Sequence, residues 1–133
     1  MKAVFADSYY FLALLSEEDA GHDRAVAASR GLTRPIVTTT WVLTEVADAM
    51  ADPLHRADLV AYVKALRADP MVNIVPASQE VFELGLDLYA RRRDKDWPLT
   101  DCISFVVMHK QGLTEALTAD HHFEQAGFKA LLR

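Results

Sequence analysis

The sequence predicts an α/β fold, a three-layer α/β/α sandwich with a central, mostly parallel sheet. Three observations favour this class. Short apolar or β-branched runs alternate with longer segments of helical periodicity along the chain, which is the pattern of βαβ units. The runs are nearly continuous in apolar residues, as expected for strands covered by helices on both faces. The chain has 133 residues, of which 51% are hydrophobic; this is enough for one core, so we expect residues 1–133 to form a single domain.

The short runs are predicted to be strands because valine, isoleucine, threonine and phenylalanine suit the pleated surface of a sheet. The first run stops at Asp7 and Ser8, and the second is almost entirely β-branched. The fourth and fifth runs each follow a glycine that suits a helix end, Gly112 and Gly127. The predicted strands are residues 4–6, 35–39, 72–75, 116–118 and 128–132.

The segments between these runs are predicted to be helices. Val42, Val46 and Met50 lie on one helical stripe, which is the pattern of a helix that packs on a sheet. Pro53 suits the first turn of the next helix, and Pro70 excludes its continuation. The predicted helices are residues 9–15, 21–30, 41–50, 53–66, 79–93 behind a serine N-cap, 100–110, and a short turn at 121–125.

Composition excludes several classes of protein. The 19 acidic residues outnumber the 14 basic ones, which gives a net charge of −5, so any contact with nucleic acid must be local. A single cysteine, Cys102, excludes an internal disulfide and a cysteine-rich zinc site, and we expect a cytoplasmic protein. Asp7 interrupts the apolar start and argues against a signal peptide. The longest apolar run, residues 9–15, is shorter than the ~20 residues that a membrane span needs.

Acidic residues follow the predicted strands at the places where a parallel sheet binds its ligands. Asp7 follows the first strand, Glu45 lies one turn into the helix after the second, and Asp120 follows the fourth. Asp101 opens the helix that precedes the fourth strand. Carboxylates gathered in one pocket raise one another's pKa unless a cation neutralises them. Oxygen ligands of this kind select Mg²⁺ or Mn²⁺ over Zn²⁺, and such ions promote phosphodiester hydrolysis.

Each acid also has an ordinary structural interpretation. Asp7 and Asp120 both precede helices and suit the N-cap position. Asp101 suits the first turn of a helix, where a negative charge is favourable. Glu45 fits the solvated face of an amphipathic helix. No single acid therefore decides the question.

Four local strings together resemble a known family. In chain order they are Val4-Phe5-Ala6-Asp7-Ser8, Thr44-Glu45-Val46, Leu99-Thr100-Asp101-Cys102-Ile103-Ser104-Phe105, and Leu117-Thr118-Ala119-Asp120-His121-His122-Phe123. They resemble the PIN domain and, more narrowly, the VapC-type toxins of bacterial toxin-antitoxin systems. The strings run from the first predicted strand to the last, so the resemblance covers essentially the whole chain.

The resemblance implies an endoribonuclease that depends on Mg²⁺ or Mn²⁺. It also implies an RNA substrate, a small antitoxin protein as partner, and a homodimer. The implied catalytic residues and metal ligands are Asp7, Glu45, Asp101 and Asp120. Thr100 and Ser104 flank Asp101 and are candidates for hydrogen bonds to the pocket, although they equally suit a cap and a helix face. Asp96 falls where relatives often carry a further acid, and the resemblance gives it at most a supporting place around the ligands.

One dense basic cluster precedes the helix that carries Asp101. It consists of Arg91, Arg92, Arg93 and Lys95. These residues are candidates for steering RNA towards the pocket. A solvated helix end, where arginines suit the helix dipole, is the alternative.

Other catalytic interpretations are weaker. Side chains of adjacent residues on a helix point about 100° apart, so His121 and His122 are not expected to share an ion. Cys102 has no assignable catalytic partner and is expected to be a buried helix residue. An aspartate-nucleophile phosphatase needs a second Asp two residues after Asp7, where this chain has Tyr9. A non-catalytic binding subunit of the same fold stays an alternative, which metal binding without turnover would indicate.

Overall fold

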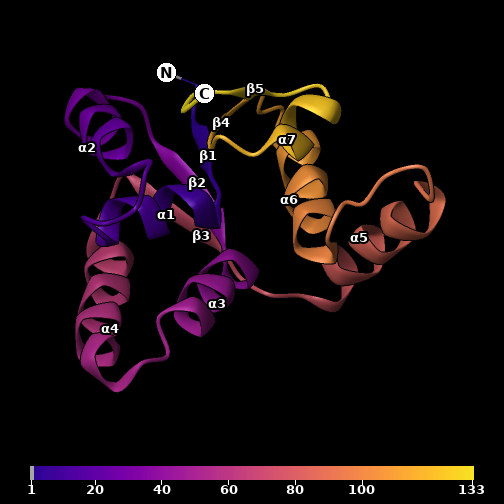
Figure 1. Cartoon of the computed structure of the whole chain (residues 1–133). Coiled ribbons are helices and arrows are strands. Elements are labelled where there is room, and N and C mark those ends of the chain that lie inside the picture. Colours follow the sequence, from indigo (N-terminus) through magenta and orange to yellow (C-terminus); the bar gives the residue numbers. More distant parts are fainter. Residues whose placement is uncertain (1) are drawn as a thin grey trace.

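The computed structural model describes residues 2–133 and contains one sheet of five parallel strands in the order β3-β2-β1-β4-β5 (Figure 1). This confirms the predicted α/β class and the parallel sheet. All strands are short, as the runs of the sequence predicted. Their bounds are β1 (Val4–Ala6), β2 (Ile36–Thr39), β3 (Val72–Val75), β4 (Glu115–Leu117) and β5 (Lys129–Ala130).

Helices cover both faces of the sheet. The first four lie on one side and the last three on the other (Figure 1), as right-handed crossovers in opposite directions along the sheet require. The bounds are α1 (Ser8–Leu15), α2 (His22–Gly31), α3 (Thr40–Ala49), α4 (Pro53–Ala68), α5 (Gln79–Arg91), α6 (Leu99–Lys110) and α7 (His121–Gln125). Within residues 2–133, we find no helix that combines the length and the apolar character needed to span a membrane.

Several helix ends differ from the prediction for local reasons. The helix α5 ends at Arg91, two residues early, because Arg92 leaves helical geometry with ψ of 61°. Pro98 is the N-cap of α6, so Thr100 lies inside the helix and does not cap it. The predicted glycine stops are confirmed, since Gly112 and Gly127 have φ of +66° and +94°, which favours glycine.

The core holds the site-bearing helices rigidly against the sheet. β1 is completely buried. The ring of Phe105 in α6 meets those of Phe123 in α7 and Trp97 edge to face, with centroids 4.9 and 5.0 Å apart; such pairs contribute about 0.5–1.5 kcal/mol beyond their burial. Gly85 lets α5 approach α6 closely, since an added Cβ would lie 2.4 Å from Ile103 Cγ1.

The order in which strands are added to the sheet reverses at the boundary between β1 and β4. From β1 the connections proceed through β2 to the β3 edge, whereas β4 and β5 lie on the other side of β1. The pairing Ala6↔Leu117 places the ends of β1 and β4 next to each other. Such a switch point is where open parallel sheets bind ligands, and the residues that follow it are Asp7 and Thr118.

Candidate active site

Asp7 stands at the N-cap position of α1 but does not cap the helix. Its Oδ2 instead accepts a hydrogen bond of 2.9 Å from Thr118 Oγ1, across the switch point. Its Oδ1 is buried without a hydrogen-bond partner among residues 2–133. The residue is only 3% exposed. A buried carboxylate oxygen without a donor is costly, so the capping interpretation of Asp7 does not account for its environment.

Asp101 lies in the first turn of α6 and is 6% exposed. Its Oδ2 is 3.1 Å from His122 Nδ1, within hydrogen-bond distance. The first-turn position agrees with the dipole interpretation, but an acid that only stabilises a helix dipole would face water. Here α6 directs it into the interior beside the other acids.

Asp120 is the N-cap of α7, and its carboxylate accepts from the His122 backbone N–H at 2.9 Å. The capping interpretation is therefore correct for this acid. The same carboxylate oxygen lies 3.3 Å from His122 Nδ1, and the Asp120 N–H donates to Thr118 Oγ1. Asp120 is thus both a cap and a neighbour of Asp7 and Asp101.

Glu45 reaches the same place from the opposite side of the switch point. Thr39 fixes the start of α3 because its side chain accepts from the Val42 N–H, and Glu45 lies one turn further. It is half-buried. The hydroxyls of Ser8 and Thr100 lie near its carboxyl, and burial raises its pKa despite them. The four acids therefore meet, and we call Asp7, Glu45, Asp101 and Asp120 the acid pocket.

The pKa values of two carboxyls in the acid pocket are raised well above their usual range. Burial, followed by the charges of Asp7, Asp120 and Glu45, raises the pKa of Asp101 to about 8. Burial raises the pKa of Asp7 to about 6, although the Thr118 hydroxyl acts against this. These carboxyls cannot all ionise at neutral pH without a compensating cation.

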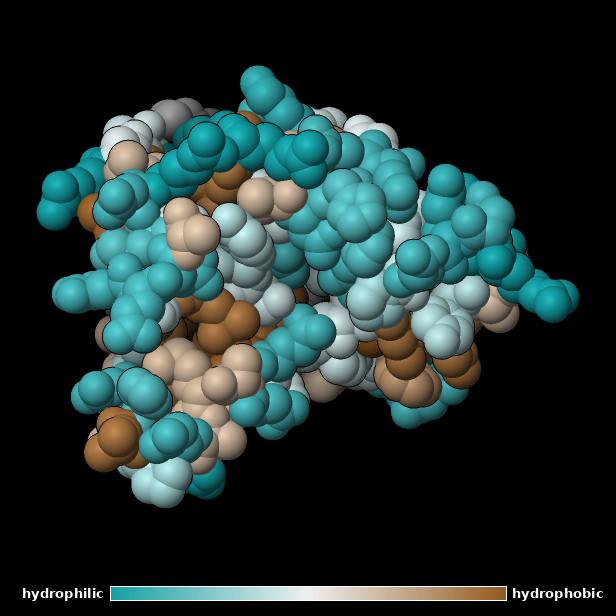
Figure 2. Space-filling view, viewed as in Figure 1, coloured by the Kyte–Doolittle hydropathy of each residue, from teal (hydrophilic) through white to brown (hydrophobic). Residues whose placement is uncertain are grey.

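The acid pocket fits a hard divalent cation. Its donors are carboxylate oxygens, which Mg²⁺ and Mn²⁺ prefer. Two buried side-chain oxygens within residues 2–133 lack a hydrogen-bond partner, Asp7 Oδ1 and Ser104 Oγ. Both belong to the residues that the sequence singled out. In Figure 2 the hydrophilic surface is hollowed between α3 and α6, the helices that supply Glu45 and Asp101.

The other predicted residues divide into two groups. Thr100 is half-buried near Glu45, and Ser104 is fully buried one turn after Asp101. Both therefore lie on the side of α6 that supports the acid pocket. Asp96 is exposed and lines a separate cavity of about 690 Å³ together with Arg93. The structure does not bring Asp96 together with the four acids.

The basic residues are mostly paired with nearby acids. Arg91 Nε contacts Asp87 at 2.9 Å. Arg92 makes two hydrogen bonds of 3.0 Å to Asp94, and its guanidinium lies 4.9 Å from the Trp97 ring centre. We call residues 91–95 the basic segment. Arg93 forms no ion pair with any residue in the described part of the chain. Arg92, Arg93 and Lys95 line the cavity next to the start of α6.

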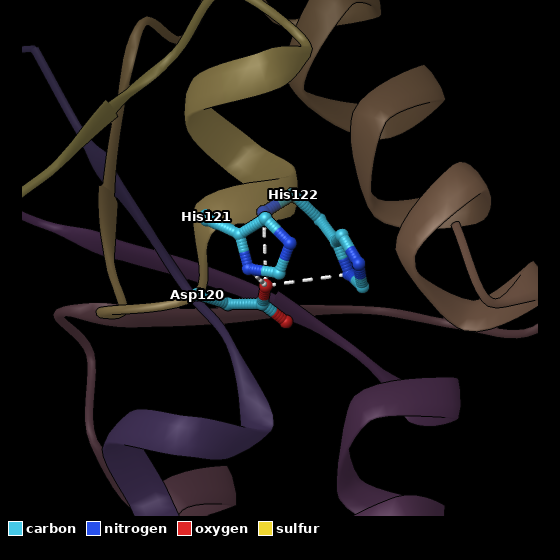
Figure 3. A group of neighbouring side chains, drawn as sticks. All are labelled: Asp120, His121 and His122. Carbon is cyan, nitrogen blue, oxygen red and sulfur yellow. Dashed lines mark hydrogen bonds and ion pairs between the residues drawn. The ribbon is translucent and has the colours of Figure 1, made fainter. Parts of the chain in front are cut away.

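The sequence did not predict that two further residues bind members of the acid pocket. Thr118 joins Asp7 to the loop of Asp120, and its place directly after a strand was the available signal. His122 joins Asp101 to Asp120. The rings of His121 and His122 lie closer than the angle between adjacent helical residues suggests, with centroids 4.4 Å apart. Both rings fold back towards the carboxylate of the N-cap, as Figure 3 shows, and helical angles alone do not predict this.

The structure also bears on the phosphatase and the cysteine-nucleophile interpretations. Tyr9, which stands where a phosphatase would need its second acid, packs with its hydroxyl against Gly21. Its side chain therefore offers no carboxylate to the acid pocket. Cys102 is fully buried and free, as expected of a helix residue in the core.

Comparisons with known proteins agree with this fold. The chain is homologous to the protein named 23S rRNA-specific endonuclease VapC20 of Mycobacterium tuberculosis. The two are 27% identical over 126 residues, or 94% of this chain and 95% of the relative. The crystal structure of that VapC20, titled a sarcin-ricin loop cleaving toxin, superposes with a TM-score of 0.85 at 25% identity over 94% of this chain and 95% of the other.

The fold is also shared with FitAcB from Neisseria gonorrhoeae. The TM-score is 0.68 at 17% identity, over 96% of this chain and 94% of that chain. The family model for the PIN domain matches residues 4–129. This match runs from β1 into β5 and includes all four acids, so the chain belongs to the PIN domain family.

Proposed function

We propose that this protein is an endoribonuclease of the VapC toxin type, which hydrolyses RNA phosphodiester bonds at the acid pocket with Mg²⁺ or Mn²⁺. One observation carries the proposal. Four carboxyls from separate segments meet at the switch point of the sheet, and the pKa of Asp7 and of Asp101 is raised to about 6 and about 8. Perturbed acids gathered in this way are typical of functional sites.

The residues of the acid pocket have distinct roles in this proposal. Asp7, Glu45 and Asp101 would hold the ion, with Asp120 as a direct ligand or one that acts through water. A bound ion supplies charge neutralisation at the phosphate and activates water for attack. Thr118 fixes the orientation of Asp7 through its 2.9 Å hydrogen bond. Such supporting contacts commonly matter 10–100-fold for metal affinity or activity.

RNA as substrate is supported by the relative named as an rRNA endonuclease and by the local charges. The chain carries a net charge of −5, so the cavity lined by Arg92, Arg93 and Lys95 is the local surface suited to a phosphate backbone. It adjoins the start of α6, which carries Asp101. We place the protein in the cytoplasm, where RNA is available and the Cys102 thiol stays reduced.

Two protein partners belong to the same proposal. A small antitoxin that presents a basic side chain would neutralise the negative charge of the acid pocket. A homodimer is supported by two apolar residues of α4 that face water, Leu54 and Val60, at 83% and 51% exposure. Apolar surface also lies over α3 and α4 in Figure 2. Light scattering after size exclusion tests the dimer, and a monomer at micromolar concentration would exclude it.

The enzymatic proposal is tested by cleavage of a mixed RNA pool by purified protein with Mg²⁺, with Mn²⁺ and with EDTA. Asp7→Asn and Asp101→Asn each remove one negative ligand while keeping its shape. Asp58→Asn, at an exposed position of α4, is the matched control. We expect metal-dependent cleavage by the parent and the control, and a loss of at least about 100-fold in both pocket variants.

Two other outcomes would contradict this proposal. Cleavage that survives in both pocket variants would exclude the acid pocket as the site. Metal binding to the pocket without cleavage of any RNA would instead indicate the non-catalytic binding subunit.

A further inference from the structure

A second group of metal-binding side chains lies beside the acid pocket and is not explained by it. It consists of Asp120, His121 and His122, at the start of α7. Figure 3 shows both imidazole rings near the Asp120 carboxylate. The Nδ1 atoms of His121 and His122 lie 3.6 and 3.3 Å from Asp120 Oδ1. The three potential ligand atoms lie within 4.8 Å of one another.

These distances suit a tetrahedral ion. Metal–ligand bonds of about 2.0–2.1 Å at tetrahedral angles separate neighbouring ligand atoms by roughly 3.3 Å. Both distances to Asp120 Oδ1 fall near this value, and the two imidazole nitrogens, which lie within 4.8 Å of each other, close on one ion when the rings rotate towards it. Three protein ligands leave a fourth position for water, which is the arrangement of an open site.

The donor types distinguish this group from the acid pocket. Imidazole nitrogens select Zn²⁺, Ni²⁺ and Cu²⁺, whereas carboxylates alone select Mg²⁺ and Mn²⁺. A helix N-terminus is unfavourable for cations. However, α7 has only five residues, and Asp120 and the adjacent acids supply negative charge. His121 has a side chain that is 62% exposed, so an ion can approach from solvent.

We propose that Asp120, His121 and His122 form a site for a divalent transition ion of the zinc type, and that its occupation inhibits the acid pocket. The two sites share Asp120. In addition, His122 Nδ1 lies 3.1 Å from Asp101 Oδ2, and an ion bound to this nitrogen takes it away from Asp101. The inhibition rests on the proposed ribonuclease function, whereas the binding does not.

The binding is tested by titrating the metal-free protein with Co²⁺, whose visible absorption reports four-coordinate ligation, and by displacement with Zn²⁺. His121→Ala removes the exposed ligand and leaves the four acids and His122 in place. His55→Ala, at another exposed histidine in α4, is the matched control. We expect His121→Ala to weaken the affinity by a factor on the order of 10 or more, and His55→Ala to leave it unchanged. An unchanged affinity in His121→Ala, or no four-coordinate Co²⁺ spectrum in the parent, would overturn the site.

The inhibition is tested in the same proteins by Mg²⁺-dependent RNA cleavage with increasing Zn²⁺. We expect His121→Ala to cleave normally in Mg²⁺ alone and to need about tenfold more Zn²⁺ for half-inhibition. Equal inhibition of both proteins would refute the coupling between the sites. If the parent cleaves no RNA, the proposed function and the inhibition both fail, while the Co²⁺ titration still decides whether the site exists.

Discussion

The acid pocket and the basic segment carry opposite charges and are built in opposite ways. The four acids come from residues up to 113 positions apart, from Asp7 to Asp120, and they converge where Asp7 and Asp101 are almost fully buried. The basic residues are neighbours in sequence and largely face water. Arg91 and Arg92 are paired with acids two to four residues away.

The comparison shows that the buried acids lower the stability of the folded state when they ionise, whereas the exposed basic residues hardly affect it. Exposed pairs such as Arg91–Asp87 contribute little to stability, at most about 1 kcal/mol, and their removal disturbs little. Burying Asp7 and Asp101 together raises the pKa of both, which makes the folded state less stable when they ionise. Perturbed acids of this kind cluster at functional sites, which supports the proposed role of the acid pocket.

The largest effect is expected from Asp101→Asn, which should lower the cleavage activity and raise the stability of the metal-free protein. Cleavage should fall by at least about 100-fold. The free energy of unfolding in EDTA at pH 8 should rise by an amount on the order of 1–3 kcal/mol, since the variant no longer carries a buried carboxyl with a pKa of about 8. Urea denaturation measures the second effect. A variant that is less stable than the parent at pH 8 would contradict the electrostatic account of the pocket.

Thr118→Val should have the next largest effect. It removes the hydroxyl that donates to Asp7 Oδ2 at 2.9 Å and leaves the shape of the side chain. We expect Mn²⁺ affinity and cleavage to fall about 10–100-fold. Thr114→Val, in the exposed loop before β4, is the control. Mn²⁺ titration calorimetry provides the readout, and equal affinities for Thr118→Val and the parent would remove the orienting role of Thr118.

The metal-free protein should lose stability as the pH rises. The pKa of Asp101 rises from 3.8 to about 8 and that of Asp7 from 3.8 to about 6 on folding. The native state therefore binds more protons than the unfolded state within these windows, and the free energy of unfolding falls from about pH 4 to pH 8. Mn²⁺ affinity should rise over the same range because the ligands must lose their protons. Denaturation in EDTA at several pH values measures the first trend; a flat profile that is shared with Asp101→Asn would contradict it.

The smallest effects are expected in the basic segment, and they should differ between its members. Arg93→Gln should weaken RNA binding and reduce the salt dependence of binding by about one phosphate contact. Arg91→Gln should change neither, because Asp87 already pairs with Arg91. Fluorescence anisotropy at several salt concentrations distinguishes them. If both variants bind RNA like the parent, the basic segment has no part in steering.

Asp101 lies in a helix that precedes a strand, and only the family resemblance implied its place beside the other acids. For Asp7, Glu45 and Asp120, which follow strands, the sequence was sufficient, because the ends of parallel strands meet at one edge of the sheet. It was not sufficient for their environment. Whether Asp7 caps α1 or bonds Thr118 depends on one side-chain rotamer, and the role of His122 depends on how its ring folds back over Asp120. The position of Asp96 was not predictable in the same way, because it lies in a loop whose path no strand or helix fixes, and its side chain lines a different cavity.

The central claim is that the acid pocket holds a divalent cation, and unfolding in the presence of Mn²⁺ tests it most directly, without knowledge of the RNA target. Binding to the native state alone stabilises it by about 2.7 kcal/mol at an ion concentration 100 times the Kd. We predict a stabilisation that grows with Mn²⁺ concentration for the parent and for Asp58→Asn, and none for the double variant Asp7→Asn/Asp101→Asn. Equal stabilisation of the double variant by Mn²⁺ would contradict the account.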